Sequence, residues 1–175
     1  MKKQILFIGI GQLGCTVADL FSRRMRGEGF SASVLAVDTD ERTLENVTDA
    51  KRISLLDYCR LGEVLDTMDA EAVKKWFPAD RERDGVEFFE CLSMHTGAGF
   101  WRMKAMLSFA SFLSKEESRD MLHAELEAVV ATASEGDEGE ERRVQIYTVA
   151  SLAGGTGSGL FIPFTLYVKK YLAER

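Results

Sequence analysis

The 175-residue sequence predicts an α/β fold, with a doubly wound, mostly parallel sheet and helices on both faces. Three observations predict it. Short runs that are apolar throughout are typical of strands buried on both faces of a parallel sheet. Segments with apolar residues at helical spacing alternate with these runs along the chain. Glycine-rich loops directly follow the first and the last of the runs, at the end of the sheet where such folds bind ligands.

Four segments have the strand pattern. They are rich in Ile, Val and Leu, which suit a buried sheet. Helical segments separate most of them, so we expect parallel pairing with right-handed crossovers. The predicted strands are Gln4–Ile10, Ser33–Val37, Arg52–Leu55 and Val144–Ser151.

Six segments have the helical pattern, with apolar residues three or four positions apart. A turn is expected at Gly11–Gly14, and Asp40 suits the N-cap of a short helix that begins near Arg42. Pro163 is expected in the first turn of the last helix, where proline is tolerated. The predicted helices are Leu13–Met25, the short one near Arg42, Glu71–Phe77, Phe100–Leu113, Glu116–Ala131 and Leu160–Leu172.

Composition and charge narrow the function classes. Hydrophobic residues make up 46% and charged residues 29%, as in ordinary globular proteins, and no apolar run has transmembrane length. The net charge of −6 argues against nucleic acid and anionic membranes as partners. The three cysteines, Cys15, Cys59 and Cys91, are odd in number and have no metal-binding spacing. They predict free thiols in a reducing compartment. The N-terminal apolar run is too short for a signal peptide, which together with the lack of a transmembrane run predicts a cytoplasmic protein without membrane insertion.

The first candidate loop is "GIGQLG", Gly9–Gly14, between a predicted strand and a predicted helix. It matches the G-x-G-x-x-G pattern of Rossmann-like folds in the correct context. Glycines let the backbone approach a phosphate closely, and a helix N-terminus offers unpaired N–H groups and a positive dipole end. A plain tight turn is the alternative interpretation.

Two further loops are weaker candidates. Asp38–Asp40 follows the second strand, where an acidic residue holds ribose hydroxyls in a dinucleotide fold or a metal-bound water in a triphosphate site. A capping aspartate without a ligand is the third interpretation. Thr96–Gly99 precedes a predicted helix, and an ordinary turn explains it as well as a phosphate contact does.

The fourth loop is in "SLAGGTGSGLF", Ser151–Phe161. Its glycines can form a nest of backbone N–H groups, to which Thr156 and Ser158 would add two hydroxyl donors. A linker is disfavoured because a buried strand and an amphipathic helix flank the segment. It is not a Walker A loop, because no lysine stands at the required position.

These loops together resemble the nucleotide-binding loops of the tubulin/FtsZ superfamily. "AGGTGSG" is similar to the family pattern G-G-G-T-G-[ST]-G and departs from it only at Ala153. "GQLG" resembles the first nucleotide loop of tubulin, and "VDTDERTL" resembles the NTD loop of FtsZ with Asp38 in place of asparagine. "TGAGFWRMKA" resembles the FtsZ G-A-G loop and its helix. The motifs follow the family order and are closest to bacterial tubulin-like proteins.

The resemblance implies a GTPase domain with GTP or GDP and Mg²⁺ as ligands. It implies that Gln12 and Asp40 lie near the Mg²⁺, directly or through water, and that Ala98 and Gly99 lie by the γ-phosphate. The nucleotide contacts it implies are Gly11, Gln12, Leu13, Cys15, Asp40, Gly97, Ala98, Gly99, Ala153, Gly154, Gly155, Thr156, Gly157 and Ser158.

The resemblance also implies a truncated domain. In the superfamily, the base-binding residues and the acidic loop that completes a neighbour's active site come after the last helix seen here. We therefore expect residues 1–175 to be the N-terminal part of a GTP-binding domain, and the catalytic residues to follow Arg175. The complete protein is expected to form head-to-tail filaments, whereas the isolated chain should bind GTP weakly and hydrolyse it at background rate.

Two alternatives stay open. An NAD(P)-binding Rossmann domain of an oxidoreductase or sensor would use "GIGQLG" and Asp38, which stands 24 positions after Gly14 (38 − 14). That alternative leaves the second glycine nest unexplained, and no hydride-transfer residue is evident. A non-catalytic tubulin-like assembly module is the other alternative, and Ala153 and Asp38, which depart from the family pattern, would permit it.

Overall fold

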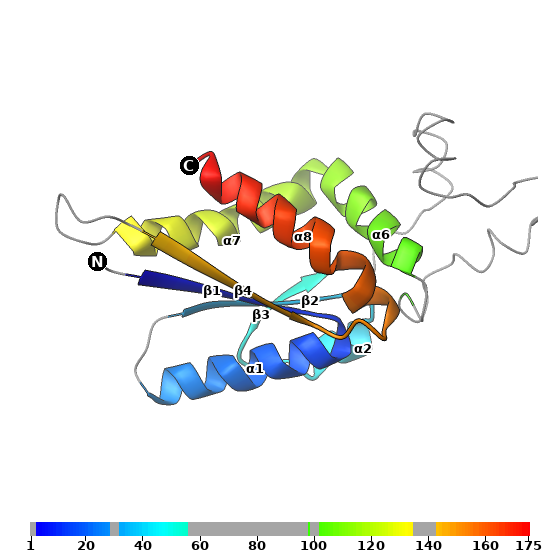
Figure 1. Ribbon diagram of the computed structural model, residues 1–175, viewed down its shortest axis with the longest axis horizontal. Coiled ribbons are helices and arrows are strands. Elements are labelled where there is room, and N and C mark those ends of the chain that lie inside the picture. The colour runs from blue at the N-terminus through cyan, green and yellow to red at the C-terminus, as the bar shows by residue number, and fades with distance from the viewer. Residues whose placement is uncertain (1–2, 29–31, 56–97, 99–101, 135–142) are drawn as a thin grey trace, which may run out of the picture.

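The described residues form a parallel four-stranded sheet (Figure 1). The computed structural model describes residues 3–28, 32–55, 98, 102–134 and 143–175. The strand order is β3-β2-β1-β4, and each neighbouring pair is parallel. The predicted parallel sheet is therefore confirmed. Its strands are β1 (Lys3–Ile10), β2 (Ala32–Asp38), β3 (Lys51–Ser54) and β4 (Arg143–Ala150).

Helices cover both faces of the sheet, as the doubly wound prediction requires. α1 and α2 lie on one face, and α6, α7 and α8 lie on the other (Figure 1). The described helices are α1 (Gly11–Gly27), α2 (Glu41–Glu45), α6 (Arg102–Ser114), α7 (Glu116–Ser134) and α8 (Gly155–Ala173). The predicted helix Glu71–Phe77 and the Thr96, Gly97 and Gly99 positions lie outside the described residues.

Strand β1 is apolar throughout because it supplies two hydrophobic cores. Leu6, Ile8 and Ile10 are fully buried in the core under α6, α7 and α8. Phe7 points to the opposite core, where its ring stacks on Phe21 of α1 with 4.3 Å between centroids. Because successive side chains of a strand alternate between faces, a strand between two helical layers needs apolar residues at every position.

The predicted strand limits are correct to within one residue, but the predicted starts of two helices are wrong. α1 begins at Gly11 instead of Leu13, and α8 begins at Gly155 instead of Leu160. Several glycines at the starts of these helices lie where a neighbouring segment passes too close for a side chain. A Cβ at Gly159, for example, would lie 2.3 Å from the Arg102 carbonyl oxygen of α6.

The earlier start of α8 also changes the position of its proline. Pro163 was expected in the first turn, but it lies inside the helix, eight residues after Gly155 (163 − 155). Proline has no N–H, so the intrahelical bond to the carbonyl four residues earlier is missing at this point. That carbonyl belongs to Gly159.

Candidate functional site

The candidate loops lie at the point where the strand order reverses. The chain passes from β1 through β2 to β3 on one side, and later adds β4 on the other side of β1. The helix that follows β1 covers one face, and the helix that follows β4 covers the other (Figure 1). Open α/β sheets bind their ligands in the crevice outside the carboxyl ends of the strands at such a switch point.

The first turns of α1 and α8 are in direct contact there. Gly11 has a φ of 75°, in the left-handed region that favours glycine, and a Cβ on it would lie 3.0 Å from the Gly157 nitrogen. A Cβ on Gly157 would lie 2.5 Å from the Ser151 carbonyl oxygen and 3.2 Å from that of Ile10. Side chains at these glycines would force the two turns apart.

Neither helix has a side-chain cap at this end. The N-cap residues are Ile10 and Gly154, both with extended backbone, and neither makes a side-chain cap hydrogen bond. Neither first turn contains an acidic residue. The first N–H groups of a helix have no partner inside it, and together with the dipole they favour an anion. The contact of the two turns therefore gathers two anion-favouring helix ends at one place.

The two hydroxyls of the glycine loop have partners inside the protein. Ser158 donates to the carbonyls of Gly154 and Gly155, the latter at 3.3 Å. The Thr156 Oγ1 lies 2.7 Å from the Thr39 Oγ1. Both hydroxyls are therefore engaged within the protein, and their predicted role as donors to a ligand stays a prediction. The nest presents backbone N–H groups.

The end of β2 and the loop after it hold one buried and one half-buried carboxylate. Asp38 is buried, and its Oδ1 accepts from the backbone N–H groups of Thr39 at 2.7 Å and Asp40 at 3.3 Å. Burial raises the pKa of the Asp38 carboxyl although these donors oppose it. A carboxyl enclosed in this way is not placed to bind the ribose hydroxyls that the dinucleotide alternative requires.

Asp40 is the N-cap of α2, as the sequence predicted. Its Oδ1 accepts from the Arg42 N–H at 3.1 Å, and its carboxylate also pairs with the Arg42 guanidinium at 3.1 and 3.2 Å. The guanidinium holds the pKa of the Asp40 carboxyl below its usual value. Asp40 is therefore ionised at neutral pH, as a carboxylate that is to hold Mg²⁺ must be.

The predicted nucleotide-contact residues differ in how exposed they are to solvent. Gln12, Leu13 and Ala153 are exposed, and Gly154 and Ser158 are half-buried. Cys15 is fully buried, and its thiol lies 3.5 Å from the Val37 carbonyl oxygen, inside the layer between helix and sheet. Burial raises the pKa of this thiol, so it is an uncharged core group. The other buried members are Gly11, Ala98, Gly155, Thr156 and Gly157.

Thr39 belongs to the site, although sequence reasoning did not select it. It is fully buried, and its Oγ1 accepts from the Ala98 N–H at 3.0 Å while lying against the Thr156 hydroxyl. It thus joins the loops after β2, before α6 and after β4. Its position between Asp38 and Asp40 was the available signal in the sequence.

The donor set near these loops suits Mg²⁺ only together with phosphate. The described residues contain no group of three or more His, Cys, Asp or Glu side chains that could hold a metal. Mg²⁺ commonly uses one or two protein carboxylates and takes its other oxygens from water and substrate phosphates. Asp40 is the carboxylate that fits this role, because its pairing with Arg42 is exposed and such pairs are weak.

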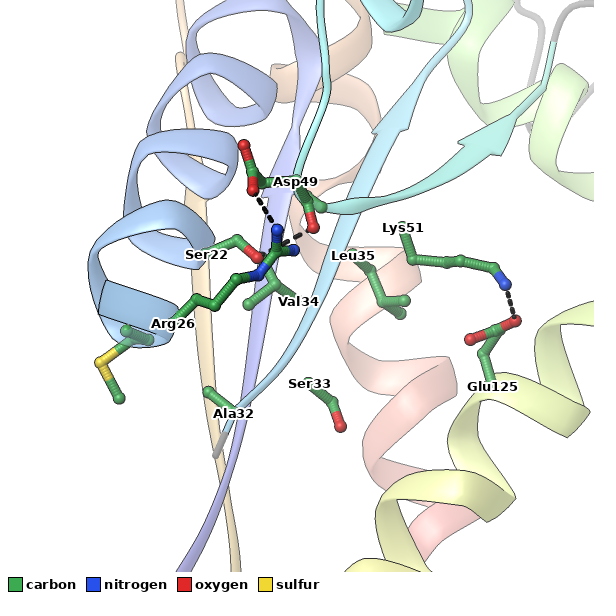
Figure 2. A pocket seen from close by; sticks show the side chains of 11 residues that line it. Ser22, Arg26, Ala32, Ser33, Val34, Leu35, Asp49, Lys51 and Glu125 are labelled. Carbon is green, nitrogen blue, oxygen red and sulfur yellow. Dashed lines mark hydrogen bonds and ion pairs between the residues drawn. The ribbon is translucent and has the colours of Figure 1, made fainter. Parts of the chain in front are cut away.

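A pocket lies at the amino ends of β2 and β3, at the opposite end of the sheet from the glycine loops (Figure 2). It measures about 490 Å³ and lies between the end of α1, the start of β2 and α7. Its charged side chains pair with each other: Arg26 contacts Asp49 at 2.7 Å, and Lys51 contacts Glu125 at 2.8 Å. None of the predicted site residues lines it, so this pocket is separate from the glycine loops.

Comparison with known proteins identifies the family. No curated protein matches the sequence. A solved structure, the GTPγS-form protofilament of TubZ from Bacillus thuringiensis serovar israelensis, is 19% identical with a TM-score of 0.47 and covers 96% of this chain. The chain corresponds to 33% of the length of that structure. No helix in the described part is long and apolar enough to cross a membrane. A family model described as "Tubulin like" matches residues 6–175, so the chain belongs to the tubulin-like family.

Proposed function

We propose that this chain is the phosphate-binding part of a tubulin-like GTPase, and that it binds guanine nucleotide with Mg²⁺ at the carboxyl end of its sheet. The contact between the uncapped first turns of α1 and α8 carries the proposal. Membership of the tubulin-like family supports GTP as the nucleotide.

In this proposal the phosphates accept hydrogen bonds from backbone N–H groups at the starts of both helices. Gly11 and Gly157 allow the two turns to meet, and Gly154 faces open space in which a Cβ would contact nothing within 4 Å. Gln12, in the first turn of α1, and Asp40, the N-cap of α2, would hold the Mg²⁺, which neutralises phosphate charge. We assign no catalytic residue. Hydrolysis, filament assembly and a cytoplasmic location are proposed for the complete protein.

The direct test is a titration of GTP, ATP and NAD against the purified chain, with and without Mg²⁺. We expect saturable, Mg²⁺-dependent GTP binding, and at one hundred times the Kd the ligand should stabilise the fold by about 2.7 kcal/mol. Gly155→Val and Thr156→Val should abolish binding, because both residues are buried in the first turn of α8. Binding of NAD without GTP would overturn the proposal.

A control threonine is available on β4, the strand that precedes α8. Thr148 accepts a hydrogen bond from the Thr165 hydroxyl at 3.0 Å, between β4 and α8, and is not one of the proposed contacts. Thr148→Val should retain GTP affinity. Equal losses in this variant and in Thr156→Val would show that the assay reports general damage to the fold.

The second candidate is a tubulin-like assembly module that binds nucleotide without turnover. The internal partners of Thr156 and Ser158 favour it, because they hold the loop in place without a ligand. Electron microscopy and phosphate release on the complete protein separate the two candidates. Filaments that form with GTP but release no phosphate would support the module.

A further inference from the structure

We propose that Thr39 is a positioning residue that fixes the three phosphate loops relative to one another. This inference rests on the proposed function, since it assigns a role within the same site. Thr39 follows β2, Thr156 is in the first turn of α8, and Ala98 lies shortly before α6. The Thr39 hydroxyl contacts both of the others, although Thr156 is 117 residues away in the sequence.

The Thr39 hydroxyl can serve both partners at once. The Ala98 N–H can only donate, so the Thr39 oxygen accepts it and the Thr39 proton is available to the Thr156 oxygen. The Thr39 backbone N–H donates to the Asp38 Oδ1 at 2.7 Å. Thr39 is therefore held at its backbone by Asp38 and at its side chain by Ala98 and Thr156.

Burial makes this chain of hydrogen bonds rigid. Exposed fractions are 1% for Ala98, 0% for Thr39, 8% for Thr156 and 3% for Asp38. Hydrogen bonds in such surroundings strengthen one another when complete, and a missing member leaves buried partners unsatisfied.

The consequence for ligand binding is preorganisation. Thr156 is next to Gly157, which contacts Gly11, so a fixed Thr156 side chain also fixes the N–H groups of both first turns. Loops that are already in place do not have to be ordered when the nucleotide arrives, and this raises affinity. Thr39 would thereby raise affinity without touching the nucleotide.

The test compares Thr39→Val and Thr39→Ser in GTPγS binding with Mg²⁺. Valine keeps the shape but removes the hydroxyl, and we expect affinity to fall by about tenfold or more. Serine keeps the hydroxyl and should bind within about twofold of the wild type. Thr148→Val removes a threonine pair elsewhere and should leave affinity unchanged.

A second readout does not require nucleotide. Hydrogen exchange at the Ala98 amide should be faster in Thr39→Val than in wild type and Thr39→Ser, because its acceptor is gone. Wild-type protein that binds no GTPγS would overturn the proposed function and this inference with it. Wild-type binding with unchanged affinity in Thr39→Val would overturn this inference alone, as would a tenfold loss in Thr39→Ser or in Thr148→Val.

Discussion

The two ends of the sheet satisfy their polar groups in different ways. At the amino end of β3, the buried Asp19 carboxylate of α1 accepts from the backbone N–H groups of Thr48, Asp49 and Ala50 at 2.8, 2.6 and 3.2 Å. At the carboxyl ends of β1 and β4, no side chain caps the first turns of α1 and α8. One end is complete without a ligand, and the other presents donors to whatever binds there.

The pocket and the proposed nucleotide site lie at different ends of the sheet. The pocket, of about 490 Å³, lies at the amino end, but its charged side chains are paired within the protein (Figure 2). The carboxyl end has two converging helix ends without caps. The site we propose therefore rests on donors without side-chain partners and not on concavity.

The largest effect should come from a side chain at the contact of α1 and α8. Gly157→Ala puts a Cβ against three backbone atoms, at 2.5 to 3.2 Å, none of which can rotate away. We expect a loss of about 3 kcal/mol in the free energy of unfolding and loss of GTP binding, measured by urea denaturation and titration.

Gly27 provides the control for this substitution, because a Cβ there contacts nothing within 4 Å. Gly27→Ala should leave stability unchanged or raise it slightly, since alanine is the better helix former. Wild-type affinity in Gly157→Ala would show that the close approach of the two turns does not matter for the ligand.

A smaller effect is expected from Asp19, at the opposite end of the sheet. Asp19→Asn removes the charge that three N–H groups and Arg23 share, and should lower the free energy of unfolding by about 1–3 kcal/mol. GTP affinity should stay within about twofold of wild type. A large loss of affinity would contradict the independence of the two ends.

The same carboxylate predicts a pH dependence. Burial alone would raise the pKa of Asp19, but the N–H groups of Asp49, Ala50 and Thr48 outweigh it and place the pKa below its usual value. A lowered folded-state pKa gives stability that is present above the unfolded value of about 3.9 and is lost as pH falls through the folded value. The stability gap between wild type and Asp19→Asn should therefore narrow below about pH 4, in denaturation curves at pH 2 to 7. A constant gap would contradict this assignment.

The smallest effect should come from the ion pairs around the pocket. The Lys51 side chain is 60% exposed and pairs with Glu125 at 2.8 Å. Lys51→Met should change the free energy of unfolding by no more than about 0.5 kcal/mol, because solvent screens such pairs. A loss above 1 kcal/mol in thermal or urea unfolding would show that the amino end depends on its surface charges.

The sequence predicted the sheet well because both faces of the inner strands are buried. A short apolar run such as Ile5–Ile10, which ends at a glycine turn, is typical of a strand between two helical layers. The starts of α1 and α8 could not be predicted in the same way. Local propensity treats Gly11 and Gly157 as turn residues, whereas the structure needs them for the contact between two segments far apart in the chain.

The candidate site was predicted as a set of loops but not as a network. The motifs selected Asp40, Ala98 and Thr156, and the structure places the last two within reach of one hydroxyl, that of Thr39. A hydrogen bond between residues 117 positions apart leaves no local pattern. The burial of Asp38 was equally hidden, because charge alone suggested a ligand contact.

Pro163 stands between two parts of α8 that have different neighbours. The first half contains the glycine turn, and the second is anchored to α7 by the Tyr167 hydroxyl on His123 at 2.7 Å and the Tyr171 hydroxyl on Glu127 at 2.8 Å. The hydrogen-bond ladder of the helix is interrupted between them, so bending is easiest there. The carbonyl of Gly159, the residue whose close approach to α6 excludes a side chain, is thus the one left without its helical N–H partner.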